Sequence, residues 1–124
     1  MSPRPITTVA ELTAAIEADD TVVVDAWAAW CGPCRMFAPV FEAAAAAHPE
    51  VTFLKIDTEA APELSGALRI MSIPTLMVFR EGVMVYNQAG ALPAAAFEQL
   101  LAQAAELDMD DVHRQVAESR AAVS

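Results

Sequence analysis

The apolar residues of this chain fall into short runs that alternate with helical patterns. Residues 21–27 and 51–57 are rich in valine, threonine and other strand-forming residues, which is typical of strands buried in a sheet. Residues 75–79 and 83–89 are two further apolar runs, separated by the short turn Glu81–Gly82. Two such runs joined by a glycine turn predict an antiparallel hairpin.

Helical periodicity predicts helices between and after these strands. The first ends near Ala18 and begins with a capping box, in which Thr8 is the N-cap and Glu11 is the third helical residue. The second runs from about Pro33 to Ala47 and contains Pro39, which must remove one backbone hydrogen bond and bend the helix. Three further helices are predicted over residues 59–67, from residue 93 onward and over 108–120, and a short edge strand over 5–7.

This order of elements predicts an α/β fold with a central mixed sheet and helices on both faces. The 124 residues suit one domain with a real core, which we assign to residues 1–106. Residues 107–124 are predicted to be a separate C-terminal helical extension. Its apolar stripe of Met109, Val112 and Val116 is thin, which favours a peripheral helix, with docking of a partner as the alternative.

The charge of the chain bears on the partners that it can bind. Seven basic against 17 acidic residues give a formal net charge of −10, which argues against nucleic acid and is simply explained by a solvated acidic surface. We find no apolar run long enough to span a bilayer and no secretory signal pattern. We therefore expect a cytoplasmic protein without membrane attachment, and a monomer by default.

The two cysteines of the chain lie in the sequence Trp30-Cys31-Gly32-Pro33-Cys34, where a predicted strand ends and a helix begins. The unpaired N–H groups and the dipole of a helix N-terminus favour a thiolate, which is the nucleophile in disulfide exchange. Cys34 is close enough to attack Cys31 once Cys31 has joined a mixed disulfide, so the pair can cycle between dithiol and disulfide. Gly32 permits the tight bend, and Pro33 suits the first helical position.

Other uses of two cysteines fit this sequence less well. A secreted domain stabilised by disulfides would carry more cysteines at wider spacing. Half of a zinc site would need another cysteine or histidine pair, but the two histidines, His48 and His113, are isolated from each other in the sequence. Zinc therefore remains a weak alternative.

Two charged residues lie inside the predicted buried strands. A buried carboxylate at Asp25 would have a raised pKa, and an acid of this kind near a cysteine pair is a candidate proton acceptor or donor. Lys55 has two interpretations. It pairs with Asp25 if the two strands are neighbours, or its amine reaches out to water.

The sequence from Trp30 to Cys34 resembles the active site of the thioredoxin family. Further matching features, in the order of the family and close to its spacing, are residues 24–28, Pro39, Lys55, residues 73–75, Gly82 and Gly90. The resemblance covers about residues 5 to 105 and implies the thioredoxin fold. The tail beyond about Leu107 lies outside it.

The resemblance also implies roles for single residues. Cys31 would be the attacking thiolate and Cys34 the buried resolving thiol, while Asp25 would move protons for Cys34 with Lys55 as its neighbour. Pro74 would be cis and pack against the cysteine pair. Ile73 would offer backbone groups to an extended substrate, and the residues expected to line a shallow apolar groove are Trp30, Gly32, Pro33, Gly90 and Ala91.

The function implied by the resemblance is that of a protein-disulfide reductase, a thiol-disulfide oxidoreductase without a bound cofactor. Its partners would be proteins that contain disulfides and a flavin-dependent thioredoxin reductase, through which electrons from NADPH restore the dithiol. One alternative is a disulfide oxidant or isomerase, against which the Gly32–Pro33 dipeptide argues. Another is a non-catalytic binding subunit. Ala26 and Ala29 depart from the family pattern, and neither touches the chemistry directly.

Overall fold

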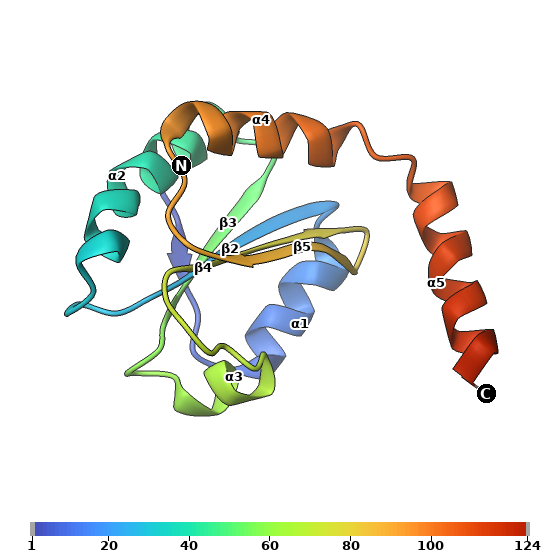
Figure 1. Cartoon of the computed structure of the whole chain (residues 1–124), viewed down its shortest axis with the longest axis horizontal. Helices are drawn as coiled ribbons and strands as arrows, with labels where there is room; N and C mark the ends of the chain where they lie inside the picture. The colour runs from blue at the N-terminus through green and yellow to red at the C-terminus, as the bar shows by residue number, and fades with distance from the viewer. Residues whose placement is uncertain (1, 124) are drawn as a thin grey trace.

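A five-stranded mixed sheet separates two layers of helices in the computed structural model, which describes residues 2–123 (Figure 1). The strands lie in the order β1-β3-β2-β4-β5; β1 and β2 run parallel to β3, while β4 runs antiparallel to both β2 and β5. The elements are β1 (Arg4–Pro5), α1 (Val9–Ala18), β2 (Thr21–Trp27), α2 (Gly32–Ala47), β3 (Thr52–Asp57), α3 (Pro62–Ala67), β4 (Thr75–Arg80), β5 (Val83–Ala89), α4 (Ala94–Ala105) and α5 (Met109–Val123). The expected α/β sheet with helices on both faces is confirmed.

The sheet buries side chains on both faces, and alternate residues of its central strands face opposite layers. One core, on the side of α1 and α3, contains Val22, Val24, Leu54, Ile56 and Met77. The other core lies beneath α2 and α4, and four of its members are Phe37, Phe41, Phe53 and Phe97. Their rings pack with centroids 5.3–6.5 Å apart. Asp25 follows Val23 by two residues and therefore faces this aromatic layer.

The edge strand and the helix predicted over residues 59–67 differ from their predicted bounds. The edge strand covers Arg4–Pro5 rather than residues 5–7. The Ile6 N–H still donates to the Lys55 carbonyl, but the Thr7 N–H donates a 3.0 Å hydrogen bond to Glu11 Oε1 at the start of α1. The predicted helix 59–67 starts only at Pro62. The preceding residues form a turn in which the Asp57 side chain accepts a 3.0 Å hydrogen bond from the Glu59 N–H.

Helix α5 lies beside the sheet and apart from the two helical layers (Figure 1, red). Asp108 caps it as predicted, since its Oδ1 accepts a 3.2 Å hydrogen bond from the Asp111 N–H. Met109 is buried, and His113 Nε2 lies 3.0 Å from Glu81 Oε1 in the β4–β5 turn. The helix thus contacts the turn of the hairpin through its first half. Met1 and Ser124, which begin and end the two predicted ranges 1–106 and 107–124, lie outside the described residues.

None of the helices within residues 2–123 combines the length and the apolar character that crossing a membrane requires.

Candidate active site

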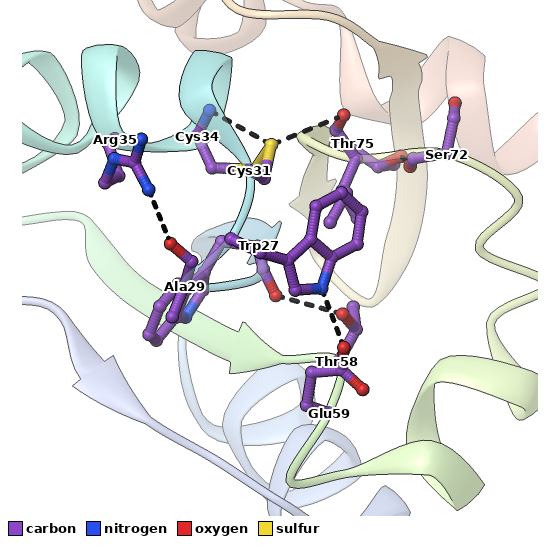
Figure 2. Close-up of a disulfide and its surroundings, with 11 residues drawn as sticks. Trp27, Ala29, Cys31, Cys34, Arg35, Thr58, Glu59, Ser72 and Thr75 are labelled. Atoms are coloured by element: carbon purple, nitrogen blue, oxygen red, sulfur yellow. Dashed lines mark hydrogen bonds between the residues drawn. A yellow bond between two sulfur atoms is a disulfide. The ribbon is translucent and has the colours of Figure 1, made fainter.

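The two cysteines lie where β2 gives way to α2, and they are joined in a disulfide (Figure 2). Cys31 is the N-cap of α2, and its Sγ accepts a 3.2 Å hydrogen bond from the Cys34 N–H. Both residues are buried, with Cα atoms 5.2 Å apart. The predicted placement of Cys31 against the helix N-terminus is therefore confirmed. An N–H directed at this sulfur favours its thiolate after reduction.

Arg35 and Glu59, which the sequence analysis did not single out for the site, support the loop before Cys31. Arg35 Nη1 donates a 2.8 Å hydrogen bond to the carbonyl of Ala29, across the start of the loop (Figure 2). Trp30 is 66% exposed, and its Nε1 donates a 2.7 Å hydrogen bond to Glu59 Oε1. The only signal for Glu59 was its position after β3, a strand whose end lies beside the end of β2.

The peptide bond between Ile73 and Pro74 is cis, as the resemblance implied. The Ile73 carbonyl oxygen lies 3.8 Å from Cys31 Sγ, which places this segment directly against the disulfide. Gly90 is tied to the same segment, because its N–H donates a 2.8 Å hydrogen bond to the Pro74 carbonyl. Its φ of 114° lies in a region that glycine enters readily.

Asp25 is the buried acid of the site. It is 1% exposed, and among residues 2–123 neither carboxylate oxygen has a hydrogen-bond partner. Burial raises the pKa of Asp25 to about 6, against the opposing effect of the Lys55 charge. This carboxyl can therefore exchange a proton near neutral pH.

Lys55 lies beside Asp25 in the sheet, since the two residues are register partners on the parallel strands β2 and β3. The two strands are therefore neighbours, which a pairing of Lys55 with Asp25 required. No ion pair joins the two side chains among the described residues, and Lys55 Nζ instead lies 4.9 Å from the centroid of the Trp27 ring. Lys55 acts on Asp25 through its charge rather than through a direct contact.

Part of the expected groove coincides with a cavity. Trp30 and Ile73 line a cavity of about 400 Å³ next to the cysteine pair, together with Thr58, Ser65, Ile70, Met71 and Ser72. The lining of this cavity does not include the other predicted groove residues, which are Gly32, Pro33, Gly90 and Ala91. Met71 is 93% exposed beside it. The cavity therefore extends from Trp30 toward the segment before Pro74.

The two histidines face carboxylates rather than the cysteines. His48 lies between Glu50 and Glu98, and His113 is beside Glu81. Over residues 2–123, no group of three or more histidine, cysteine or acidic side chains is placed to hold a metal ion.

Comparisons with known proteins agree with this geometry. A family model described as thioredoxin matches residues 5–103. The chain belongs to the thioredoxin family. It is 54% identical over 103 residues to the Streptomyces coelicolor protein named "Putative thioredoxin 2", covering 83% of this chain and 77% of that protein. It is 49% identical over 94 residues to a thioredoxin of Alicyclobacillus acidocaldarius, covering 75% of this chain and 87% of the relative.

A solved structure extends the thioredoxin match to three dimensions. A mutant thioredoxin from Halobacterium salinarum superimposes with a TM-score of 0.78 and 31% sequence identity, over 86% of this chain and 93% of that one. The sheet and helices described above are thus a thioredoxin fold. With its Cys31–Cys34 redox pair, this member of the thioredoxin family is a thiol-disulfide oxidoreductase that reduces disulfides.

Proposed function

We propose that the chain reduces disulfides of target proteins in two exchange steps. The Cys31 thiolate attacks one sulfur of the target disulfide, which forms a mixed disulfide and releases one target thiolate. The Cys34 thiolate then attacks Cys31 Sγ, so that the intramolecular disulfide forms and the second target thiolate leaves. The target gains two electrons, and the cysteine pair loses two. The observation that carries this order is the hydrogen bond from the Cys34 N–H to Cys31 Sγ.

Asp25 is the proposed proton acceptor for Cys34. A buried thiol at Cys34 must lose its proton before it can attack, and a carboxyl with a pKa of about 6 is a competent base near neutral pH. The leaving thiolates of the target take up protons in turn. Lys55 moderates the basicity of Asp25 through its charge.

The proposed substrate surface surrounds the exposed ring of Trp30. Ile73 offers backbone groups beside Cys31, and Pro74 keeps the chain close to the sulfur. Gly32, Pro33, Gly90 and Ala91 complete the apolar rim that an extended target segment would cross. The hydrogen bond between Gly90 and Pro74 supports this grouping.

The proposed partners are disulfide-containing proteins and a flavin-dependent thioredoxin reductase, which passes two electrons from NADPH to the Cys31–Cys34 disulfide. A couple that is recycled in this way needs a compartment with an NADPH supply, and we therefore place the protein in the cytoplasm. We also propose that it acts as a monomer. We treat residues 1–106 as the thioredoxin domain and residues 107–124 as a helical extension. The end of the family match at residue 103 supports this division.

The equilibrium reduction potential of the Cys31–Cys34 couple in glutathione buffers tests the direction of the reaction. A potential more negative than that of the cytosolic glutathione pool is expected for a reductase. A more positive potential would make the disulfide the working form and favour the oxidant or isomerase. A pair that never closes would leave only the binding subunit.

Substitution of single cysteines tests the order of attack. The Cys34→Ser variant is expected to accumulate a mixed disulfide between Cys31 and the target, detectable as an adduct on a non-reducing gel. The matched Cys31→Ser variant should give no adduct. Adducts of equal yield from both variants would contradict the assignment of Cys31 as the nucleophile.

A further inference from the structure

Lys55 and Trp27 form a contact beside the cysteine pair that the two exchange steps do not use. The 4.9 Å between Lys55 Nζ and the Trp27 ring centroid is within the range of a cation–π attraction. The Trp27 carbonyl accepts hydrogen bonds from the N–H and the hydroxyl of Thr58, at 2.9 and 3.1 Å. The Trp27 side chain packs against the cluster that contains Cys31 and Cys34. The ring is thus part of a fixed surface on which the ammonium rests.

Asp25 lies on the same face of the sheet and could compete for this ammonium. In the parallel pair of strands, Asp25 is opposite Lys55 and Trp27 is opposite Asp57, so the four side chains project from one face. The Asp57 carboxylate is directed to the Glu59 N–H. In the part of the chain that the structure describes, no ion pair joins Lys55 to Asp25, although both Asp25 oxygens lack a hydrogen-bond partner. The indole ring therefore contacts the ammonium where a carboxylate could.

Within residues 2–123, the charge of Lys55 is the one charge that shifts the pKa of Asp25. Its partner on β4 is Leu76, and the disulfide at the start of α2 is uncharged. Arg35 on α2 is directed to the carbonyl of Ala29. Burial raises the pKa of Asp25, and the Lys55 charge is the opposing influence. The position of one ammonium therefore decides how far the carboxyl is stabilised in its ionised form.

We propose that Trp27 is a positioning residue, whose ring holds the Lys55 ammonium and so keeps the buried carboxyl of Asp25 without a direct cationic partner. The meaning of this arrangement for the reaction rests on the proposed role of Asp25 as the proton acceptor of Cys34. A direct ion pair would favour the carboxylate and make it a weaker base, because an opposite charge at contact lowers the pKa of an acid. The ring thus preserves the basicity that the resolving step needs.

The test compares two substitutions of Trp27 in the oxidised full-length chain. Trp27→Leu removes the π face, and Trp27→Phe keeps one. The titration midpoint of Asp25 is read from the ¹³C resonance of its side-chain carboxyl. Trp27→Leu is expected to lower this midpoint by about one pH unit, since the released ammonium can reach the carboxylate. Trp27→Phe should leave the midpoint close to that of the parent protein.

A second substitution separates the ammonium from a simple opening of the core to water. Combining Trp27→Leu with Lys55→Met should abolish the lowering, measured against Lys55→Met alone, because no ammonium remains to move. A lowering of equal size with and without Lys55 would mean that the ring only excludes water, and the proposal would be wrong. An unchanged midpoint in Trp27→Leu would overturn it as well.

A measurement on the parent protein does not depend on the folding of any variant. Lys55 is the single lysine of the chain, so its Hε protons can be assigned without ambiguity. Protons above an indole face resonate upfield, and we expect such a shift in the folded protein and its loss in urea. Hε protons at the unfolded position in the folded protein would contradict the contact.

The pH profile of target reduction in the same variants distinguishes this proposal from the proposed function. A profile that moves with the Asp25 midpoint supports both. A shifted midpoint with an unchanged profile would support the positioning role of Trp27 and remove Asp25 from the resolving step.

Discussion

The two ends of the central sheet bury charged side chains in opposite ways. Toward the end of β2, Asp25 is buried on the face of the sheet that α2 and α4 cover, and among residues 2–123 its carboxyl has no hydrogen-bond partner. Where β2 begins, Arg80 is also buried, yet its guanidinium donates to Asp20 Oδ2 at 3.1 Å and to the Ala104 carbonyl at 2.5 Å. A second carboxylate, that of Glu81, lies 3.9 Å from the guanidinium.

The difference shows how one sheet can serve stability at one end and chemistry at the other. A buried charge with partners holds elements together, and Arg80 joins β4 to the end of α4. A buried carboxyl without partners is unfavourable when ionised, so it keeps a proton to higher pH. Asp25 therefore gives the site an acid that titrates near neutrality, at a cost to the free energy of folding.

The largest expected effect follows from replacing Asp25 by asparagine. Because the pKa of Asp25 is about 6 in the folded protein and 3.8 for an ordinary aspartate, the folded state binds the proton more tightly than the unfolded chain. The contribution of Asp25 to the free energy of unfolding therefore falls as the pH rises from about 4 through 6. Between pH 4 and pH 8, Asp25→Asn should gain between about 2 and 3 kcal/mol of stability relative to the parent.

Urea unfolding of both proteins at pH 4 and pH 8 measures this gain. Asp110→Asn, on the exposed surface of α5, is the matched control. Its free energy of unfolding should change between the two pH values as that of the parent does. Equal pH dependence of the parent and Asp25→Asn would mean that the carboxyl is not held in an unfavourable environment.

At the other end of the sheet, where β2 begins, replacing the buried charge is expected to lower the free energy of unfolding rather than raise it. Arg80→Met should destabilise the fold by about 2 kcal/mol, because the Ala104 carbonyl and Asp20 lose a charged donor. Arg69 is exposed and supplies the control, since Arg69→Met should change the free energy of unfolding by less than about 0.5 kcal/mol. If Arg80→Met and Arg69→Met unfolded at the same urea concentration, the partners of Arg80 would not stabilise the fold, and the contrast with Asp25 would be wrong.

A smaller effect is expected for the histidine at the same end. His48 caps α2, and its Nε2 lies 2.7 Å from Glu98 Oε2 on α4. This hydrogen bond, helped by Glu50, raises the pKa of His48 above 6.5. The stabilisation is therefore complete below pH 6.5 and is lost as the pH rises through the raised pKa.

Glu98→Gln should accordingly destabilise the protein at pH 6 by about 0.5 kcal/mol and have little effect at pH 9. NMR titration should show the pKa of His48 falling toward that of a free histidine. His113, whose neighbour is Glu81, serves as the internal reference. A His48 titration that Glu98→Gln leaves unchanged would show that the pair does not form in solution.

Much of the fold could be predicted because its signals are local. The capping box is an example, since Thr8 and Glu11 are three residues apart and exchange hydrogen bonds as predicted, both at 3.1 Å. The cysteine pair is another, because three residues of spacing at the start of a helix fix its geometry. The third helix begins at Pro62 rather than at the predicted residue 59, because a turn stabilised by the Asp57 side chain precedes it.

Contacts between distant segments could not be predicted in this way. The bond between Trp30 and Glu59 spans 29 residues, and that between Arg80 and Asp20 spans 60. Both depend on which strands become neighbours and on side-chain directions that no periodicity encodes. Whether the Lys55 ammonium contacts the Asp25 carboxylate or the Trp27 ring also depends on side-chain directions and could not be predicted.

Pro39 affects how readily the first turn of α2 opens compared with the rest of the helix. A proline within a helix lacks the N–H that would bond the carbonyl four residues earlier, and here that carbonyl belongs to Arg35. The first turn of α2, which carries Cys34, is thus less firmly tied to the rest of the helix, while Phe37 and Phe41, on either side of Pro39, are both held in the aromatic core. Brief local opening should therefore cost less free energy around the resolving thiol than around the core. We therefore expect one missing hydrogen bond to let the two ends of a single helix open at different rates.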